Sequence, residues 1–231
     1  TVLVFYKLFL FNLFPIPSNL LVSFYFPWSS GGWSGYDPLT THKEFIGSDA
    51  IRQHIPWHNL TFASIKNGLL PQWNPYNFSG SPHLANIQTF IFNPFNIFFL
   101  IFPLFTAWNI FIVIQVPLSI FFTFLFVRTL GLRRSSALFA GITFTFSSYF
   151  VYWLEIGIVG YSILWLPLLL FSVQKLQNTF KIRYFCLLVA GSVASIFAGH
   201  IQTSIFIFAL VALFWLVVAF RKSNKNEKKK N

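Results

Sequence analysis

The sequence predicts an all-α integral membrane protein. Hydrophobic residues make up 55% of the 231 residues, and charged residues make up only 9%. Several apolar windows approach the roughly 20 residues that a helix needs to cross a hydrocarbon core about 30 Å thick. Lipid offers no hydrogen-bond partners to an open strand edge, so these windows are expected to be helices.

The formal net charge of +11 at pH 7 does not indicate nucleic-acid binding. The basic residues lie at the ends of apolar windows instead of on one soluble face, which is typical of membrane topology. No nucleic-acid partner is therefore expected. The single cysteine, Cys186, lies inside an apolar window and excludes an intrachain disulfide. The sequence contains no methionine, and we expect it to be an N-terminal fragment of a longer chain that otherwise forms one transmembrane domain over residues 1–231.

Six windows are expected to span the membrane, in chain order Val2–Phe26, Ala107–Val127, Ser135–Trp153, Tyr161–Val173, Tyr184–Ala198 and Ile201–Phe220. The first has Lys7 near its start, as a signal peptide would. Bulky residues follow its apolar core where a cleavage site needs small ones, so we interpret it as a retained anchor.

The remaining apolar piece, Phe90–Phe105, decides the topology. Most Lys and Arg residues fall in three clusters, near Arg128–Arg134, Lys175–Arg183 and in the tail 221–231. The positive-inside rule assigns all three clusters to the cytoplasm. With six spans and the N-terminus inside, this placement requires that Phe90–Phe105 does not cross the membrane, so we interpret it as a re-entrant or surface helix broken by its two prolines. An alternative layout has seven full spans and an outer N-terminus, and it places the polar segment 28–86 in the cytoplasm.

In the six-span layout, residues 28–86 form a large first external loop. Within it, the stretch Ser48–Gly68 shows a helical pattern, which predicts a helix lying in the headgroup plane. We expect Pro56 to divide this helix into two short pieces, and Gly68 to end it. The expected apolar face consists of Ile51, Ile55, Phe62, Ile65 and Leu69. The expected polar face consists of Asp49, Arg52, Gln53, Asn59 and Asn67.

Two acids and one late histidine are expected on the outer side. Asp49 and Arg52 are three residues apart and share a helix face, as a solvated ion pair or as a proton acceptor beside a phosphate-binding guanidinium. Glu155 follows the third span, and His200 lies in the turn between the last two. An acid near membrane depth is a candidate functional residue or simply reaches interfacial water.

No cofactor is expected. His54 and His58 are four residues apart and are the candidates for a divalent metal, but Pro56 lies between them and no third ligand is apparent. Trp28 and Trp33 are interpreted as part of an interfacial aromatic belt. Trp73, inside the run Pro71–Tyr76, is a candidate for substrate contact.

The order of several motifs resembles the YfhO-like membrane proteins of bacteria, which are similar to the GT-C glycosyltransferase superfamily. The motifs are Asp49 with Gln53 and Pro56, Asn67–Tyr76 (NGLLPQWNPY), Gly80–Pro82, Ala85–Gln88, Asn93–Asn96 and Gly199–Gln202. The resemblance covers about Gly47 to Gln202, and the block around Trp73 is its most specific part.

The resemblance implies an enzyme with a GT-C-like fold in a bacterial or archaeal cytoplasmic membrane, active on the extracytoplasmic face. Its donor is a polyprenyl-phosphate sugar, and its acceptor is a cell-envelope glycan, lipid or protein. In such enzymes an acid in the first external loop is the base, which matches Asp49, and Glu155 loosely matches a second acid. Arg52, Lys66 or His200 would receive the phosphate charge, and Trp73 and Tyr76 would stack on the sugar. Further polar candidates for substrate binding are Gln53, Asn74, Asn86, Gln88 and Gln202.

Two other classes of function stay open at the sequence level. A transporter or lipid flippase would also use broken helices such as Phe90–Phe105, but should bury charge near the middle of the membrane, where these windows have almost none. A non-catalytic membrane partner of another transferase would keep the fold without the chemistry.

Overall fold

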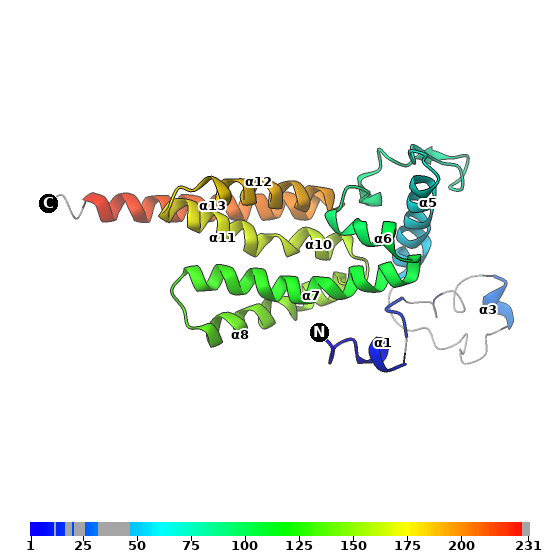
Figure 1. The fold of residues 1–231 in the computed structure, drawn as a ribbon, viewed down its shortest axis with the longest axis horizontal. Coiled ribbons are helices and arrows are strands. Elements are labelled where there is room, and N and C mark those ends of the chain that lie inside the picture. The colour runs from blue at the N-terminus through cyan, green and yellow to red at the C-terminus, as the bar shows by residue number, and fades with distance from the viewer. Residues whose placement is uncertain (12, 17–19, 21–25, 32–46, 228–231) are drawn as a thin grey trace.

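The computed structural model describes residues 1–231 except 12, 17–19, 21–25, 32–46 and 228–231. The described part is mostly helical, as the composition predicts (Figure 1). Within it, three helices are long and apolar enough to cross a membrane: Leu104–Thr129, Ile158–Asn178 and Ile201–Arg221. A shorter apolar helix covers Ile182–Phe197. The mostly helical architecture and the presence of membrane-length apolar helices are thus confirmed, and the six spans and the GT-C-like fold stay predictions.

Seven helices form an elongated bundle (Figure 1). They are α7 (Leu104–Thr129), α8 (Arg134–Thr145), α9 (Ser148–Trp153), α10 (Ile158–Leu164), α11 (Leu166–Asn178), α12 (Ile182–Phe197) and α13 (Ile201–Glu227). Helix α11 packs against α7, α12 and α13, while α8 packs along α7. Glycines with positive φ lie at three turns: Gly131 follows α7, Gly157 precedes α10 and Gly199 follows α12. A residue without Cβ adopts this conformation freely.

Two of the predicted spans have different limits in the structure. The window Ser135–Trp153 was expected to be one span but forms α8 and α9, separated where Ser147 adopts an extended conformation. Neither piece alone is long enough to cross a bilayer. The helical segment that contains the window Tyr161–Val173 is longer than expected, since α10 and α11 together cover Ile158–Asn178. Pro167 is accommodated because it occupies the first turn of α11.

The N-terminal part contributes α1 (Tyr6–Phe11) and α3 (Trp28–Gly31). Part of the predicted span Val2–Phe26, and residues 32–46 of the predicted external loop, lie outside the described residues. The described loop then contains α4 (Gly47–Asp49), the π-helix η1 (Ala50–His54), α5 (Ile55–Lys66), and strands β1 (Trp73–Asn74) and β2 (Ser81–Pro82). The two strands pair antiparallel, with Trp73 opposite Pro82.

The piece Phe90–Phe105 forms no long helix. It contains the 3-10 helix η3 (Pro94–Asn96) and the short helix α6 (Ile97–Ile101), and Pro103 starts α7. Another 3-10 helix, η2 (Ile87–Thr89), precedes it. The two prolines break the apolar run as expected, since neither can continue a helix with a normal hydrogen bond.

Candidate functional site

Residues 47–96, here called the cap segment, lie across the end of the bundle where α7 begins (Figure 1). Phe90 connects the two parts. Its ring stacks on Phe111 of α7 at 5.5 Å and lies 5.8 Å from the His54 ring. A Cβ added at Gly199 would lie 3.0 Å from the Phe90 Cβ, so the α12–α13 turn packs directly against the cap segment. Segments more than a hundred residues apart in sequence therefore share this end.

The buried face of α5 differs from the predicted one. The buried residues of η1 and α5 are Ala50, His54, Trp57, His58, Thr61 and Phe62. Of the predicted apolar face, Phe62 is buried, Ile55 and Ile65 pack partly against the core, and Leu69 is exposed. The expectation was wrong in part because it assigned His54 and His58 to neither face, whereas both are buried. The i, i+4, i+7, i+8 spacing of the buried set was the signal that would have found it.

Pro56 does not divide the helix, contrary to expectation. The helical backbone is continuous from Gly47 to Lys66, and Pro56 lies in the first turn of α5. The π-type turn before it explains this, because the Ile55 N–H bonds to the Ala50 carbonyl. The wider turn changes the local hydrogen-bond register, and such turns are frequent beside functional residues. Gly68, at φ 74°, follows the helix end as predicted.

Asp49 is half-buried at the start of this helix. The Gln53 side-chain amide donates to its Oδ1 at 3.3 Å, and Arg52 is exposed on the next turn. An amide partner orients a carboxylate without neutralising it, so Asp49 can still accept a proton. Lys66 lies at the opposite end of the same helix, roughly 25 Å away at about 1.5 Å per residue. The structure therefore does not bring Lys66 and Asp49 together in one sugar-sized site.

His58 lies at the centre of the cap segment and is 1% exposed. Its Nδ1 lies 3.0 Å from the His54 carbonyl and its Nε2 lies 3.3 Å from Asn96 Oδ1. The Asn96 amide donates to the carbonyls of Phe90 and Ile91, which turns its oxygen toward His58. A neutral imidazole has one N–H and can donate to only one of these two acceptors at a time.

Burial lowers the pKa values of the cap histidines. Desolvation lowers the pKa of His54 to about 4, against a raising effect from the Gln88 backbone. Desolvation, assisted by the neighbouring His54, lowers the pKa of His58 to about 3. Desolvation also lowers the pKa of His83, whose Nε2 lies 2.8 Å from Thr61 Oγ1. Both His54 and His58 are therefore neutral at pH 7 and act there as packing and hydrogen-bonding groups.

The hairpin at Trp73–Pro82 presents aromatic side chains. Trp73 is 54% exposed and Tyr76 is 81% exposed. A Cβ at Gly80 would lie 2.4 Å from the Trp73 indole nitrogen, so the indole packs directly over the glycine backbone. Asn74 is buried and its Oδ1 accepts from the Tyr76 N–H at 2.9 Å, which makes it a turn-forming residue.

Asn86 also has a local structural contact. Its Oδ1 accepts from the Gln88 N–H at 3.1 Å and caps η2. The Gln88 side chain is exposed. Of these two predicted contacts, Gln88 is the one whose side chain is free to reach a ligand from solvent.

Glu155 and His200 lie toward the same end of the bundle as the cap segment. Glu155 is half-buried and precedes Gly157, where an added Cβ would lie 2.8 Å from the Phe111 ring. His200 Nδ1 accepts from the Thr203 backbone N–H at 3.3 Å and lies 2.7 Å from its hydroxyl, and burial lowers the pKa of His200. It therefore caps α13 in neutral form. Gln202 is exposed in the first turn of that helix.

Sequence reasoning missed Gln115, which is fully buried in α7. Its Nε2 donates to the Leu154 carbonyl at 3.2 Å, beside Glu155. Gly160 makes room for it, since a Cβ there would lie 2.3 Å from Gln115 Oε1. A glutamine inside an apolar window, with a glycine on a later helix, was the available signal, because polar side chains in membranes bond across helices.

Among the described residues, no three His, Cys, Asp or Glu side chains are grouped closely enough to hold a metal ion. His54 and His58 share a helix, but both point into an aromatic and amide environment. The ring of Phe90 lies 4.2 Å from that of His58.

Comparison of the chain with protein-family models, with curated proteins and with solved structures gave no match.

Proposed function

We propose that this protein is a membrane glycosyltransferase that transfers a sugar from a polyprenyl-phosphate donor to an extracytoplasmic acceptor. The acceptor would be a cell-envelope glycan, lipid or protein. One observation carries the proposal: a half-buried carboxylate, Asp49, has an amide partner one turn along its helix and a guanidinium on the same helix, at the bundle end where α7 begins. The motif resemblance to GT-C-like proteins supports the same reaction.

The reaction requires one base and a neutralised leaving phosphate. Asp49 takes the proton of the acceptor hydroxyl while the acceptor oxygen bonds to the anomeric carbon, with inversion. The bond from that carbon to the phosphate oxygen breaks, and polyprenyl phosphate leaves. Arg52 is the cation nearest to Asp49 along the helix and is suited to the phosphate. Trp73 and Tyr76 are exposed, but their hairpin follows the Lys66 end of α5, so stacking on the sugar at Asp49 is not assigned to them.

The membrane setting agrees with a lipid-linked donor. A polyprenyl tail stays in the bilayer and delivers its phosphate at the interface. The three long apolar helices carry no Asp, Glu, Lys, Arg or His before their last turns. Charge near mid-membrane, which a transporter of polar substrates would use, is absent from these described helices. The interfacial end is therefore the better location for polar chemistry.

Sugar transfer in membranes that contain the full-length protein tests the proposal. The probes are radiolabelled polyprenyl-phosphate glucose, mannose and N-acetylglucosamine. We expect Asp49→Asn to lower the transfer rate by at least about a hundredfold, the usual contribution of a general base. The protein level in the membrane is measured alongside. Undiminished transfer by this variant would exclude Asp49 as the base.

Two cations of the same helix provide a matched pair. Arg52→Gln should slow transfer, because the phosphate loses its counter-charge, whereas Lys66→Gln should leave the rate within about twofold, since a surface charge this far away acts weakly. Equal effects of both variants would contradict the assignment of Arg52. If no labelled donor is consumed by the wild type, the non-catalytic partner or the transporter becomes the better explanation.

A further inference from the structure

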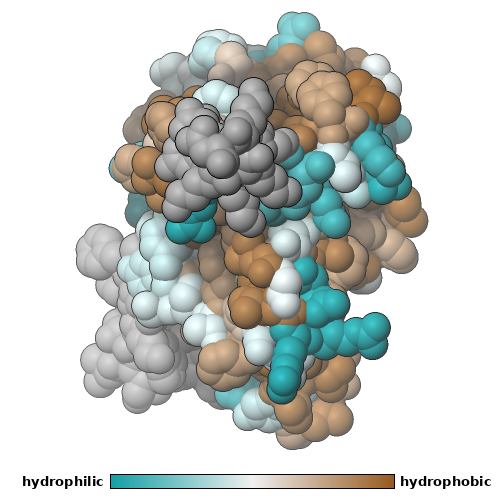
Figure 2. Space-filling view, turned by 90° about the vertical axis from the view of Figure 1, so that its left-hand side faces the viewer, coloured by the Kyte–Doolittle hydropathy of each residue, from teal (hydrophilic) through white to brown (hydrophobic). Residues whose placement is uncertain are grey.

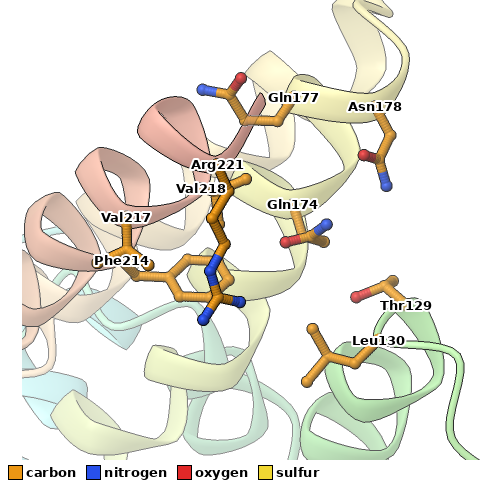
Figure 3. Close-up of a pocket in the computed structure, with 9 residues that line it drawn as sticks. All are labelled: Thr129, Leu130, Gln174, Gln177, Asn178, Phe214, Val217, Val218 and Arg221. Atoms are coloured by element: carbon orange, nitrogen blue, oxygen red, sulfur yellow. The ribbon is translucent and has the colours of Figure 1, made fainter. Parts of the chain in front are cut away.

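The end of the bundle opposite the cap segment contains a cleft of about 730 Å³. It lies between the last turns of α7, α11 and α13 (Figure 3). Helices α7 and α13 each pack on α11, and the ring of Phe126 on α7 meets that of Phe214 on α13 at 5.5 Å beside the cleft. This volume is in the range that holds a small polar molecule or headgroup.

The walls of the cleft are divided by polarity. On α13, Phe214, Val217 and Val218 form an apolar stripe at helical spacing, and Arg221 continues it one turn later. On α11, Gln174 and Asn178 present amides, and Thr129 ends α7 (Figure 3). This order matches a lipid, because the apolar wall can contact the acyl chains while the amides and the guanidinium can contact the headgroup.

The charge around the cleft is strongly positive. Seven basic residues with described side chains belong to the loops and helix ends here: Arg128, Arg133, Arg134, Lys175, Lys181, Arg183 and Arg221. The acidic residues with described side chains are Asp49 and Glu155, and both lie toward the opposite end. Figure 2 views this end and shows hydrophilic side chains gathered between hydrophobic ones. The electrostatic complement of such a surface is an anion at the membrane interface.

Arg221 is the cation placed to act inside the cleft. Its side chain points into the space between α13 and the ends of α11 and α7 (Figure 3). Other cations are engaged locally: Arg128 donates to the Leu132 carbonyl, and Arg183 donates to the Tyr184 hydroxyl. The carboxyl-terminal ends of α7 and α11 carry partial negative charge, which repels a bare anion. A guanidinium is therefore required to hold one here.

We propose that this cleft binds the phosphate headgroup of an anionic phospholipid such as phosphatidylglycerol. Arg221 bonds the phosphate, Gln174 and Asn178 bond headgroup hydroxyls, and the acyl chains follow Phe214 and Val218 along α13. The inference concerns the basic end of the molecule and is independent of the transferase chemistry proposed for the other end.

Lipid retention on the full chain tests this proposal. The protein is reconstituted in nanodiscs of phosphatidylcholine with increasing phosphatidylglycerol, and bound lipid is counted by native mass spectrometry. We expect one phosphatidylglycerol per chain at low mole fraction. Arg221→Gln should weaken this binding by about tenfold or more, the value of a charged hydrogen bond. Gln174→Leu, which keeps all charges, should weaken it by about threefold.

The matched control is Arg183→Gln, which removes the same charge at the same end but does not line the cleft. It should change the affinity by less than about threefold. Equal losses in Arg221→Gln and Arg183→Gln would overturn the site and indicate diffuse attraction to the surface. Complete displacement of the lipid by millimolar inorganic phosphate would overturn it as well, since the cleft would then take free phosphate.

Discussion

At the scale of residues, the cap segment is built around neutral histidines in an apolar environment. His54 and His58 are 3% and 1% exposed, and aromatic rings of Phe90, Phe99 and Trp108 surround the His58 ring. A charged imidazole would lose its hydration there without gaining a carboxylate partner among the described residues. Folding therefore selects the neutral form.

This selection predicts a loss of stability in mild acid. The folded-state pKa values of about 4 and about 3 lie below the ordinary value of 6.5, so the unfolded chain takes up protons first. Stability is then complete above pH 6.5 and falls as the pH drops toward 4, by up to about 1.4 kcal/mol per pH unit for each histidine. The thermal midpoint in detergent at pH 7.5, 6.5, 5.5 and 4.5 measures this.

His54→Leu is the variant for comparison, because it removes one of the two most strongly shifted histidines and keeps an apolar side chain in a buried position. Its midpoint should fall less steeply with decreasing pH than that of the wild type. A wild-type midpoint that rises on acidification, or a slope that His54→Leu leaves unchanged, would contradict the role of these two groups.

At the scale of elements, the α7–α8 pair depends on close backbone approach. Gly141 of α8 faces α7, where an added Cβ would lie 2.8 Å from the Ile120 carbonyl oxygen and 3.2 Å from its Cα. Backbone atoms cannot move aside as a flexible side chain does. Small residues are common where membrane helices approach this closely.

The substitution Gly141→Ala separates packing from helix propensity. Propensity alone favours alanine by about 1 kcal/mol, whereas the clash with α7 costs about 1–3 kcal/mol. We expect a lower thermal midpoint in detergent. Gly191→Ala is the control, because its nearest neighbour would be the mobile Leu169 Cδ2 at 2.9 Å, and it should be close to neutral. A gain in stability from Gly141→Ala would show that propensity dominates.

At the scale of the whole molecule, the two ends of the bundle differ in charge and chemistry. The cap segment, Glu155 and the α12–α13 turn lie toward one end, and the basic loops lie at the other. From the positive-inside rule we predict that the cap segment lies on the extracytoplasmic side. This assignment decides whether Asp49 meets lipid-linked sugars outside the cell or soluble metabolites inside it.

Cysteine labelling tests this orientation. In a Cys186→Ser background, Ser79→Cys in the exposed hairpin should react with a membrane-impermeant maleimide in intact cells. Thr179→Cys in the α11–α12 turn should react only after the cells are permeabilised. Protection of both sites until the cells are permeabilised would support the seven-span alternative, which places the polar segment in the cytoplasm together with the α11–α12 turn. Each site reports on one face, so the two variants control for one another.

The sequence by itself determined the membrane helical class, the long helices α7 and α13, the break at Pro94 and Pro103, and the end of α5 at Gly68. These depend on apolar length and on the backbone limits of proline and glycine, which act locally. It did not determine the buried face of α5, because a histidine's environment is set by what packs on it. Phe90, Phe99 and Phe111 come from distant segments and make that site apolar.

Only the tertiary structure decided which candidates share a location. It separated Lys66 from Asp49 along one helix, gave Asn74, Asn86 and His200 local hydrogen bonds, and added Gln115 beside Glu155. It also gathered Arg221, Gln174 and Thr129 around one cleft from three helices. The sequence specifies the chemistry of each side chain and its spacing along the chain. The distances between helices arise from packing, and a site depends on those distances.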